Sequence, residues 1–352
     1  MTASSATPAA PVESFDTVHA RVLRGFPMLV SELGGSVDPL LHAAGIPAAP
    51  GDAAARQITY RQHVLLLELA ADRLGRPDFG LRLASRQGAA MFGPMGAAMR
   101  HSRTLGDALG YVARHSYAHS LAARIWLRRQ GEDGLLFIGH DILLGGLPRR
   151  AQAMEQIMLA GHLGALELTG GRARVRRVHF RHQPVSPPRD YRRYFGCDVR
   201  FGMDEDGVFF SDADLACPVA EPDDWALPHI TAWIDRRFTR QRPPFHAEAR
   251  GVVMQLLATG DCRNARVAAQ LGLHPRTLRR RLCDEGTSFQ KVKDEVRRDI
   301  MLYFLEQTAL DFTRISEKLG FSEQSVMTRT CRRWFSASPS AIRRKARDMA
   351  RP

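Results

Sequence analysis

The chain has 352 residues, of which 44% are hydrophobic, and it carries 50 Lys plus Arg against 37 Asp plus Glu. This length predicts two or three domains with cores of their own, and the composition excludes a largely disordered or collagen-like chain. No apolar run approaches the roughly 20 residues of a membrane span, and residues 1–12 lack the basic start and apolar stretch of a signal peptide. We therefore expect a cytoplasmic protein without a membrane partner, with a disordered tail over residues 1–14.

The positive charge is concentrated in the last third of the chain. Residues 241–352 hold 22 Lys plus Arg against 12 Asp plus Glu, a net charge of +10, whereas residues 1–240 have a net charge of only +3. This asymmetry is typical of a nucleic-acid-binding module joined to a domain with another task. A basic patch also suits anionic lipid or a solvated face, so the spacing of the residues has to decide.

Residues 15–217 are predicted to form an α+β domain in which helices precede an antiparallel sheet. Thr104 and Asp107 stand three residues apart, as in a capping box, at the start of one of these helices. Apolar spacing predicts helices over 15–32, 39–44, 59–74 and 104–120. A hairpin, a long helix and further short elements follow, at 121–128, 135–141, 147–168, 174–181, 188–195, 198–201 and 207–210.

The main linker is expected over residues 218–244. It ends in a Pro-rich stretch at 241–244, where the charge of the chain changes. Residues 224–240 have helical spacing of apolar residues, so the linker is predicted to carry a helix.

After the linker, two segments resemble each other at an offset of 48 residues. Residues 267–273 and 315–321 both contain an apolar residue, three intervening positions, a Leu-Gly pair and another apolar residue. Gly permits a left-handed turn and the flanking apolar residues lock two helices together, which is the spacing of a helix-turn-helix. One such segment is a weak signal, but two in tandem within a basic region favour a DNA-binding domain.

The helix expected after the first turn, over 275–284, has two different faces. Leu278 and Leu282 lie within about 40° of each other, and the opposite side carries Arg276, Arg279 and Arg280. With no acidic residue among them, these charges repel one another unless a polyanion binds. We therefore favour a DNA-reading surface over a solvated Arg-rich face.

The helix expected after the second turn, over 323–335, is also two-sided. Apolar residues such as Met327 and Cys331 lie on the packing side. The other side has amide, hydroxyl and guanidinium groups, which hydrogen-bond base edges and phosphates. These groups belong to Gln324, Ser325, Thr328, Arg329 and Arg332.

A longer helix is predicted between the two units, over about 287–306, with Thr287 and Gln290 in a capping-box pattern. Its length of about 27 Å is close to one turn of duplex DNA. The two reading helices are therefore predicted to reach successive major grooves.

Several separate motifs now resemble one family, the AraC-type transcriptional regulators: residues 276–282, 286–289, 319–322 and 338–339. The resemblance covers about 247–344 and implies a DNA-binding domain with two helix-turn-helix units over 245–346, followed by a tail over 347–352. It maps the first reading helix onto Arg276, Arg279 and Arg280, and the second onto Gln324, Ser325, Thr328 and Arg329.

The sequence departs from this family's pattern at four positions. His274 stands where a capping Ser is usual, Met327 and Cys331 replace aromatic core residues, and Ser336 replaces the Gly after the last reading helix. These departures concern the packing and stability of the second unit more than its docking on DNA.

A looser resemblance covers about residues 29–210. Residues 92–99 followed by 104–109 are similar to the effector-binding domain, often labelled arabinose-binding, of one branch of these regulators. This implies a domain that binds a small-molecule effector, while the label does not identify the effector or the residues that bind it.

Signals for an enzyme are weak. His115 and His119 have the spacing of a metal pair on one helix face, but no adjacent Glu or third ligand accompanies them, so a polar helix face is favoured. The chain has neither a phosphate-binding loop nor a nucleophile elbow. Its five cysteines are odd in number and lack a C-x-x-C pair, which favours reduced thiols. We expect no catalytic residue, metal or cofactor.

The leading hypothesis is a sequence-specific transcription regulator controlled by a small-molecule effector in its first domain. Its expected partners are promoter DNA, the effector, RNA polymerase if it activates transcription, and a second copy in a homodimer. An architectural DNA-binding protein without sequence preference is the alternative, and the base-reading side chains Gln324 and Thr328 speak against it. A metal enzyme built on His115 and His119 is a distant third.

Overall fold

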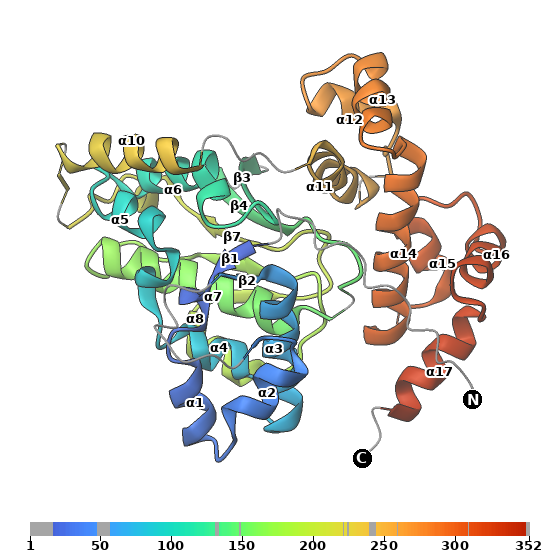
Figure 1. Cartoon of the computed structure of the whole chain (residues 1–352), viewed down its shortest axis with the longest axis horizontal. Coiled ribbons are helices and arrows are strands. Elements are labelled where there is room, and N and C mark those ends of the chain that lie inside the picture. Colours follow the sequence, from blue (N-terminus) through green and yellow to red (C-terminus); the bar gives the residue numbers. More distant parts are fainter. Residues whose placement is uncertain are drawn as a thin grey trace.

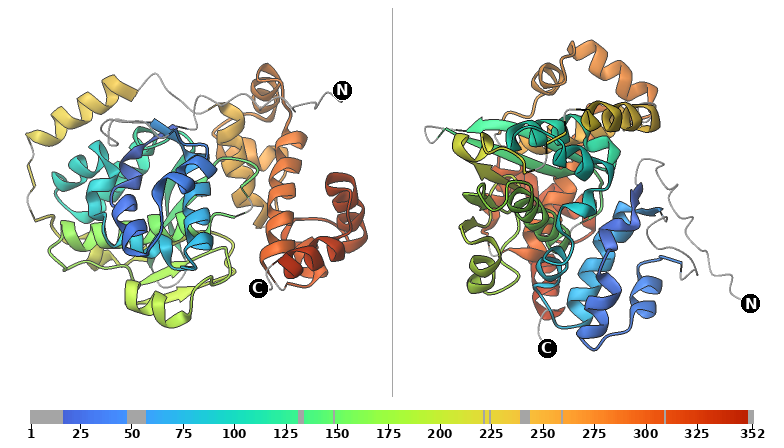
Figure 2. Two further views of the ribbon diagram at one scale, coloured as in Figure 1. Left: turned by 60° about the horizontal axis from the view of Figure 1, so that its bottom comes forward. Right: turned by 90° about the vertical axis from the view of Figure 1, so that its left-hand side faces the viewer.

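The chain folds into an N-terminal α+β region and a C-terminal helical region that lie side by side (Figure 1). The left-hand view of Figure 2 shows the same separation. The expected fold class is confirmed. The computed structural model describes residues 17–47, 57–130, 134–147, 149–220, 222–223, 225–238, 244–258, 260–308 and 310–349.

A five-stranded sheet forms the centre of the N-terminal region, with strand order β3-β4-β7-β5-β6. The predicted hairpin is confirmed, because Ala123 pairs with Ile142 and Gln130 with Leu135 in one antiparallel register. The sheet is antiparallel except at one edge, where β6 runs parallel to β5. The strands are β3 (Ala123–Gln130), β4 (Leu135–Ile142), β5 (Arg177–His179), β6 (Asp198–Arg200) and β7 (Gly207–Phe210).

The helix α7 (Ala151–Leu168) lies at the centre of the helical packing and is buried on most of its surface. It packs closely on α4 (Phe79–Ala84): a Cβ at Gly80 would lie 2.1 Å from the carbonyl oxygen of Gln152, so only Gly fits there. The other helices of this region are α2 (Val37–Ala43), α3 (Tyr60–Arg73), α5 (Pro94–Arg100), α6 (Leu105–His115), α8 (Pro188–Phe195), α9 (Asp212–Leu215) and α10 (Ala226–Phe238).

Local capping signals position two of these helices. The Thr104 hydroxyl accepts the backbone N–H of Asp107 at 3.1 Å, and the Asp107 carboxylate accepts the N–H of Thr104 at 3.2 Å, which confirms the predicted capping box. Thr59 and Gln62 form a second capping box at the start of α3. Both boxes satisfy N–H groups that the first helical turn leaves without an internal partner.

The start of the region differs from the expectation of one helix over 15–32. Thr17–His19 form the strand β1, which pairs with β2 (Gln57–Thr59), and only Phe26–Glu32 form the helix α1. Gly25 interrupts the helical pattern because it adopts the left-handed conformation at φ 78°. The helices α4 and α5 were not predicted, and the tail expected over residues 1–14 lies outside the described residues.

The C-terminal region is helical throughout its described part, and it contains two separate cores. The longest helix, α14, contributes Val292 and Val296 to the first core and Met301 and Leu305 to the second. Its cap is Ser288, whose hydroxyl accepts the N–H of Lys291, one residue later than the predicted cap. The helices are α11 (Phe245–Ala258), α12 (Asn264–Gln270), α13 (Pro275–Asp284), α14 (Phe289–Gln307), α15 (Phe312–Lys318), α16 (Gln324–Phe335) and α17 (Pro339–Met349).

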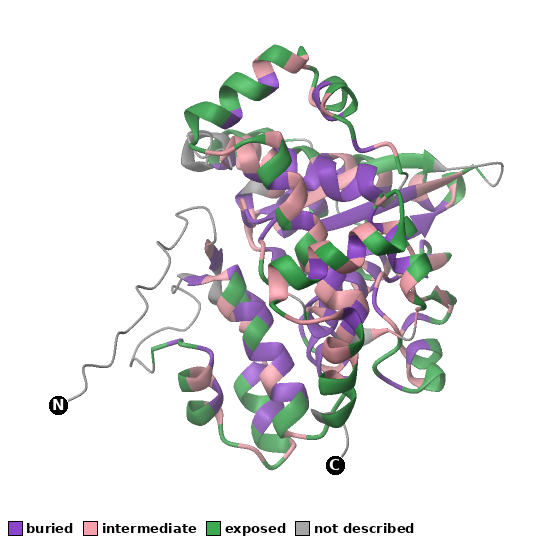
Figure 3. Ribbon diagram, turned by 90° about the vertical axis from the view of Figure 1, so that its right-hand side faces the viewer, coloured by how far each residue is buried: buried purple, intermediate pink, exposed green. Residues whose placement is uncertain are grey.

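Buried residues gather around the sheet and the long helices, whereas the outermost helices are mainly exposed (Figure 3). The helix predicted within the linker is present as α10, and it packs on α5 with Ile234 fully buried. The last helix, α17, continues past residue 346 into the segment predicted to be a tail. None of the helices in the described part of the chain combines the length and apolar character needed to cross a membrane.

Candidate DNA-binding interface and interdomain cavity

The helix α13 presents three guanidinium groups on a rigidly held surface. Leu278 and Leu282 anchor its inner side and are fully buried, while Arg276, Arg279 and Arg280 are exposed on the outer side. Within the described part of the chain, none of these three guanidinium groups has an ion pair or a hydrogen bond. The predicted two-sided helix is therefore present, with an uncompensated positive surface.

His274 starts α13 in the place of the usual capping Ser. Its Nδ1 accepts the backbone N–H of Arg276 at 3.2 Å, and Pro275 occupies the first helical position. At the other end, Gly286 adopts φ 69°, and its N–H bonds to the carbonyl oxygen of Cys283 at 2.9 Å. Both ends of this helix thus have capping groups that suit their positions.

The helix α16 also exposes the predicted polar side and buries Met327 and Cys331 completely. Two of its candidate residues already have partners. The Gln324 side-chain carbonyl accepts the Thr313 hydroxyl at 2.9 Å, and the Ser325 hydroxyl donates to a Glu323 carboxylate oxygen at 3.0 Å. The remaining candidates are Thr328, which is half-buried, and the exposed Arg329 and Arg332.

The ends of α16 are less well capped than those of α13. The N-cap residue Glu323 makes no side-chain capping hydrogen bond. At the C-terminal end, Ser336 adopts φ 53°, and it is the one non-glycine residue with a positive φ in the described part of the chain. A side chain in this conformation costs conformational energy that Gly would not.

Two basic residues of α14, which the sequence analysis missed, hold the units together. The Arg297 guanidinium donates to the carbonyl oxygens of Leu319 (2.9 Å) and Gly320 (2.6 Å), in the turn of the second unit, and stacks over Phe321. Lys293 donates to the carbonyl oxygen of Cys262, before the first unit, at 2.6 Å. Their spacing of four residues places both on one face of α14. This spacing is the sequence feature from which their shared role could have been predicted.

The first unit is tied to the sheet by a chain of hydrogen bonds. The Asp141 carboxylate on β4 accepts the side-chain amide of Gln255 on α11 at 3.4 Å, in addition to bonds from Arg124 and Trp126. The Gln255 side chain in turn accepts the amide of Gln270 on α12 at 3.1 Å. The sheet of the N-terminal region is therefore linked to the first helix of the first unit.

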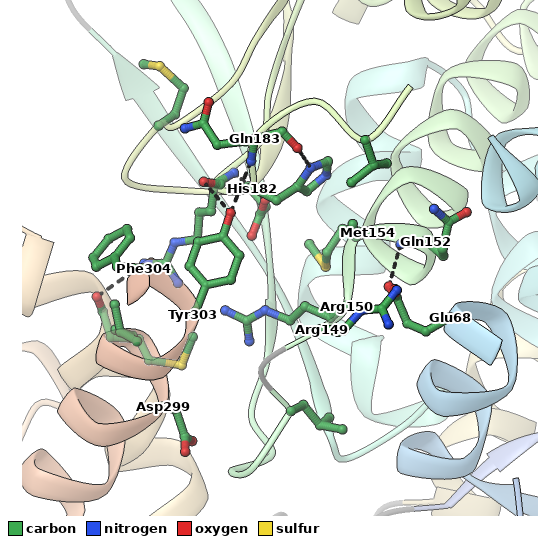
Figure 4. A pocket seen from close by; sticks show the side chains of 18 of the residues that line it. Glu68, Arg149, Arg150, Gln152, Met154, His182, Gln183, Asp299, Tyr303 and Phe304 are labelled. Carbon is green, nitrogen blue, oxygen red and sulfur yellow. Dashed lines mark hydrogen bonds and ion pairs between the residues drawn. The ribbon is translucent and has the colours of Figure 1, made fainter. Parts of the chain in front are cut away.

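The helix α14 also contacts the N-terminal region. The Asp299 carboxylate accepts the backbone N–H of Gly146 at 3.0 Å and forms an ion pair with Arg250 of α11. The Tyr303 hydroxyl accepts the N–H of Gln183 at 3.1 Å and donates to the carbonyl oxygen of Arg181 at 3.3 Å (Figure 4). Lys318, at the end of α15, pairs with Asp204 at 2.7 Å.

A cavity of about 510 Å³ lies between the two regions. Its walls come from the end of α3, the start of α7 and the loops after β5 and before β7 on one side, and from α11 and α14 on the other. This volume falls within the range of about 300–1,000 Å³ that is usual for small-molecule sites. The effector site was expected within the first domain, whereas this cavity belongs to both regions.

The structure does not place His115 and His119 on one helix face as predicted. His115 is the last residue of α6, and the 3-10 turn Ser116–Ala118 separates it from His119. His115 Nδ1 is 2.9 Å from the carbonyl oxygen of Tyr111, and the His119 ring meets Phe92 edge-on. No group of three potential metal ligands occurs among the described residues, and all five cysteines are free thiols.

Comparisons with known proteins find relatives of both regions of the chain. A family model for the arabinose-binding N-terminal domain of AraC transcription regulators matches residues 34–219, and a helix-turn-helix domain model matches residues 267–345. The HTH-type transcriptional regulator VirS of Mycobacterium tuberculosis is 32% identical, over 93% of this chain and 96% of its own. The ornithine utilization regulator of Pseudomonas aeruginosa is 26% identical, over 90% and 93% of the two chains. The crystal structure of CdpR from Pseudomonas aeruginosa aligns with 87% of this chain and 96% of its own, at 23% identity and a TM-score of 0.40.

Proposed function

The chain belongs to the AraC-type transcription regulators with an arabinose-binding-type effector domain, and from this premise we propose how its residues divide the work. The protein is a sequence-specific DNA-binding regulator. We assign DNA reading to residues 245–346, effector binding and association to residues 15–217, and the connection to residues 218–244.

In this proposal α13 enters the major groove with Arg276, Arg279 and Arg280. The supporting observation is their exposure without an acidic partner, on a helix whose other side is locked in a core. A guanidinium fits the O6 and N7 acceptors of guanine with two hydrogen bonds, and it also binds phosphate. The rotation of α13 decides which of the three reaches a base.

The second unit is proposed to enter the next major groove on the same side of the DNA. Arg329 and Arg332 are free to contact bases or phosphates, and Thr328 lies beside them on α16. Gln324 and Ser325 have to exchange their present hydrogen bonds for contacts with DNA. The 19 residues of α14 span about 28 Å, which corresponds to major-groove segments centred roughly 10 bp apart.

Further partners follow from the same role. A small-molecule effector fits the arabinose-binding-type domain, although the name of that domain does not identify the effector. A relative named for ornithine utilization supports control by a small metabolite. We further propose that the protein works as a cytoplasmic homodimer and contacts RNA polymerase when it activates transcription. No catalytic step is assigned to any residue.

Selection of bound sequences from a random duplex library tests this function. The wild-type chain is expected to enrich a motif with two segments about 10 bp apart. It is also expected to remain bound to that motif in the presence of excess bulk DNA. Enrichment of no motif, with affinity that bulk DNA removes completely, would favour the architectural alternative. Affinity is also expected to fall steeply with salt, because each neutralised phosphate releases counterions.

A further inference from the structure

The cavity between the two regions contains an Arg side chain that no other group satisfies. Arg150, at the start of α7, extends across the cavity toward α14 (Figure 4). Among the described residues its guanidinium has neither an ion pair nor a hydrogen bond. Arg150 is half-buried, and desolvation lowers the pKa of its guanidinium group, because a partly buried cation without an ion-pair partner is less stable than one in water.

The other charged groups of the cavity are already engaged. Arg149 pairs with Asp72 at 2.7 Å and Glu68 at 3.2 Å, while Lys318 pairs with Asp204. Asp299 is held by Arg250 and the N–H of Gly146.

The remaining pair of charged groups, Arg181 and Asp206, is engaged as well. The Arg181 guanidinium bonds to the carbonyl oxygens of Asp204 and Met254, and its backbone N–H donates to the Asp206 carboxylate at 2.8 Å. Asp206 and Asp299 favour the charged form of Arg150, and Arg181 and Arg250 oppose it, but none of the four forms an ion pair with it.

The chemistry of the walls narrows the class of ligand. Among the described residues, Arg150 is the cationic side chain of the cavity that has neither an ion pair nor a hydrogen bond, so its guanidinium group suits a ligand with one negative charge. A dianion would meet repulsion from the acidic residues around it. Much of the remaining surface is apolar, and it includes Met254 and Leu257 on α11 and Ile300 and Phe304 on α14. Apolar walls with one convergent charged group are typical of sites for small organic ligands.

We propose that this cavity binds a small amphipathic carboxylate, whose carboxylate pairs with Arg150 and whose apolar body lies along α11 and α14. Arg and carboxylate can form two parallel hydrogen bonds, which suits a site with a single anchoring charge. Insofar as this ligand is the effector, the inference rests on the proposed function.

The position of the cavity also gives the ligand a way to regulate DNA binding. Its walls belong to both regions, so a ligand that touches both binds their docked arrangement more tightly than a separated one. The ligand therefore stabilises the docked arrangement, in which α11 holds the first unit against the sheet. By linkage, any DNA site that prefers one arrangement must alter the affinity for the ligand by the same factor.

Calorimetric titration of the full-length chain tests the site. The probes are octanoate and 3-phenylpropanoate, with octanamide and 3-phenylpropanamide as uncharged matches and inorganic phosphate as an anion without an apolar body. We expect saturable binding of at least one carboxylate and at least 10-fold weaker binding of its amide and of phosphate. Equal binding of an acid and its amide, or no binding of either carboxylate, would overturn the proposal.

Substitutions then locate the binding charge. Arg150→Gln is expected to weaken carboxylate binding by about 10- to 100-fold, Arg150→Lys by less, and Arg189→Gln, at an exposed position on α8, not at all. Unchanged affinity in a folded Arg150→Gln protein would refute the assignment. If that variant does not fold, crystals of the wild-type chain with 3-(4-bromophenyl)propanoate settle the matter, because the bromine signal has to lie between α11 and α14; a signal elsewhere contradicts the proposal.

The same preparations separate this inference from the proposed function. Specific DNA binding without carboxylate binding would support the proposed regulatory function and contradict the proposed ligand site. Arg150-dependent carboxylate binding in a protein that selects no DNA motif would support the ligand site and contradict the proposed regulatory function.

Discussion

The two helix-turn-helix units follow the same sequence spacing, but the structure holds them in different ways. In the described part of the chain, the first unit has 13 buried hydrophobic residues in its core and the second has six. The first is bonded to the sheet through Gln255 and Gln270. For the second unit, Lys318 forms an ion pair with Asp204, and Tyr303, on the part of α14 that packs in the second core, bonds to the loop after β5.

The capping of the two helices α13 and α16 also favours the first unit. His274 and Gly286 suit the two ends of α13, whereas α16 begins without a capping side chain and ends at Ser336 with a positive φ. The comparison teaches that a shared motif spacing does not imply equal stability. We infer that the first unit is the firmly placed reader and that the second adjusts on DNA.

Acid should act on the two units unequally. Burial lowers the pKa of His63 and His140 in the N-terminal region from the ordinary 6.5 to about 4. Each His then binds a proton more readily in the unfolded chain, so its stabilising effect is complete above pH 6.5 and is lost as the pH falls toward 4. At pH 5 the two together should cost roughly 4 kcal/mol of unfolding free energy.

Hydrogen exchange at pH 7 and pH 5, corrected for intrinsic rates, would measure this effect. Amides of the sheet and of α11, which docks on it, should lose protection, while those of α16 should change little. Equal losses in α11 and α16 would contradict the unequal attachment.

Moving the two half-sites apart should have the next largest effect. An insertion of 5 bp between the two protected segments turns the second to the far side of the duplex, where the α14-linked units cannot both reach. Affinity should fall by about 100-fold, toward that of one unit. A 10 bp insertion should not restore it, because α14 cannot lengthen. Footprints and titrations that survive the half-turn insertion would mean that one unit alone reads DNA.

Removing single guanidinium groups should separate the two readers. Arg280→Ala is expected to weaken specific binding by about 1–3 kcal/mol and to relax preference at one operator position. Arg329→Ala in the less constrained second unit should cost less. Arg314→Ala, an exposed residue of α15 paired with Glu317, is the matched control. Equal losses on all sequences would place Arg280 on a phosphate instead.

The hydrogen-bond chain to the sheet should contribute a smaller amount. Gln255→Leu keeps the size of a buried side chain but removes its bonds to Asp141 and Gln270, so we expect a loss of about 1 kcal/mol in unfolding free energy. Gln290→Leu, which removes an exposed bond to Asp294 within α14, should cost less. Denaturant titrations that give the same unfolding free energy for the two variants would contradict a stabilising role of the hydrogen bonds between the sheet, Gln255 and Gln270.

The smallest effect concerns the ends of the reading helices. Ser336→Gly relieves the positive φ and should stabilise the chain by about 0.5–1 kcal/mol, while Gly286→Ser should destabilise it by about 1 kcal/mol. Thermal unfolding of both variants measures these two changes in stability. A destabilised Ser336→Gly protein would show that the Ser side chain has a favourable contact that outweighs the strain.

Local signals explain why much of the fold could be predicted. Thr104 with Asp107 marked a helix start, and the two Leu-Gly turns marked the units, because each depends on neighbours in the sequence. The strand β1 was missed because its pairing partner, β2, lies about 40 residues away. The residues around Arg150 come together from α7, α11, α14 and two loops, and no local pattern carries such long-range contacts. The DNA-contact residues remain predictions.

The sharing of α14 by two cores limits how this protein can diverge. Adding one residue inside α14 would rotate everything after it by about 100° and shift it by about 1.5 Å. Met301 and Leu305 would then turn away from the core they now fill. An insertion or deletion in this helix would therefore disrupt the second core, so we expect the length of α14 to be kept during evolution. Exposed side chains on α13 and α16 can change without disturbing either core, so we expect target sequences to diverge through substitutions there.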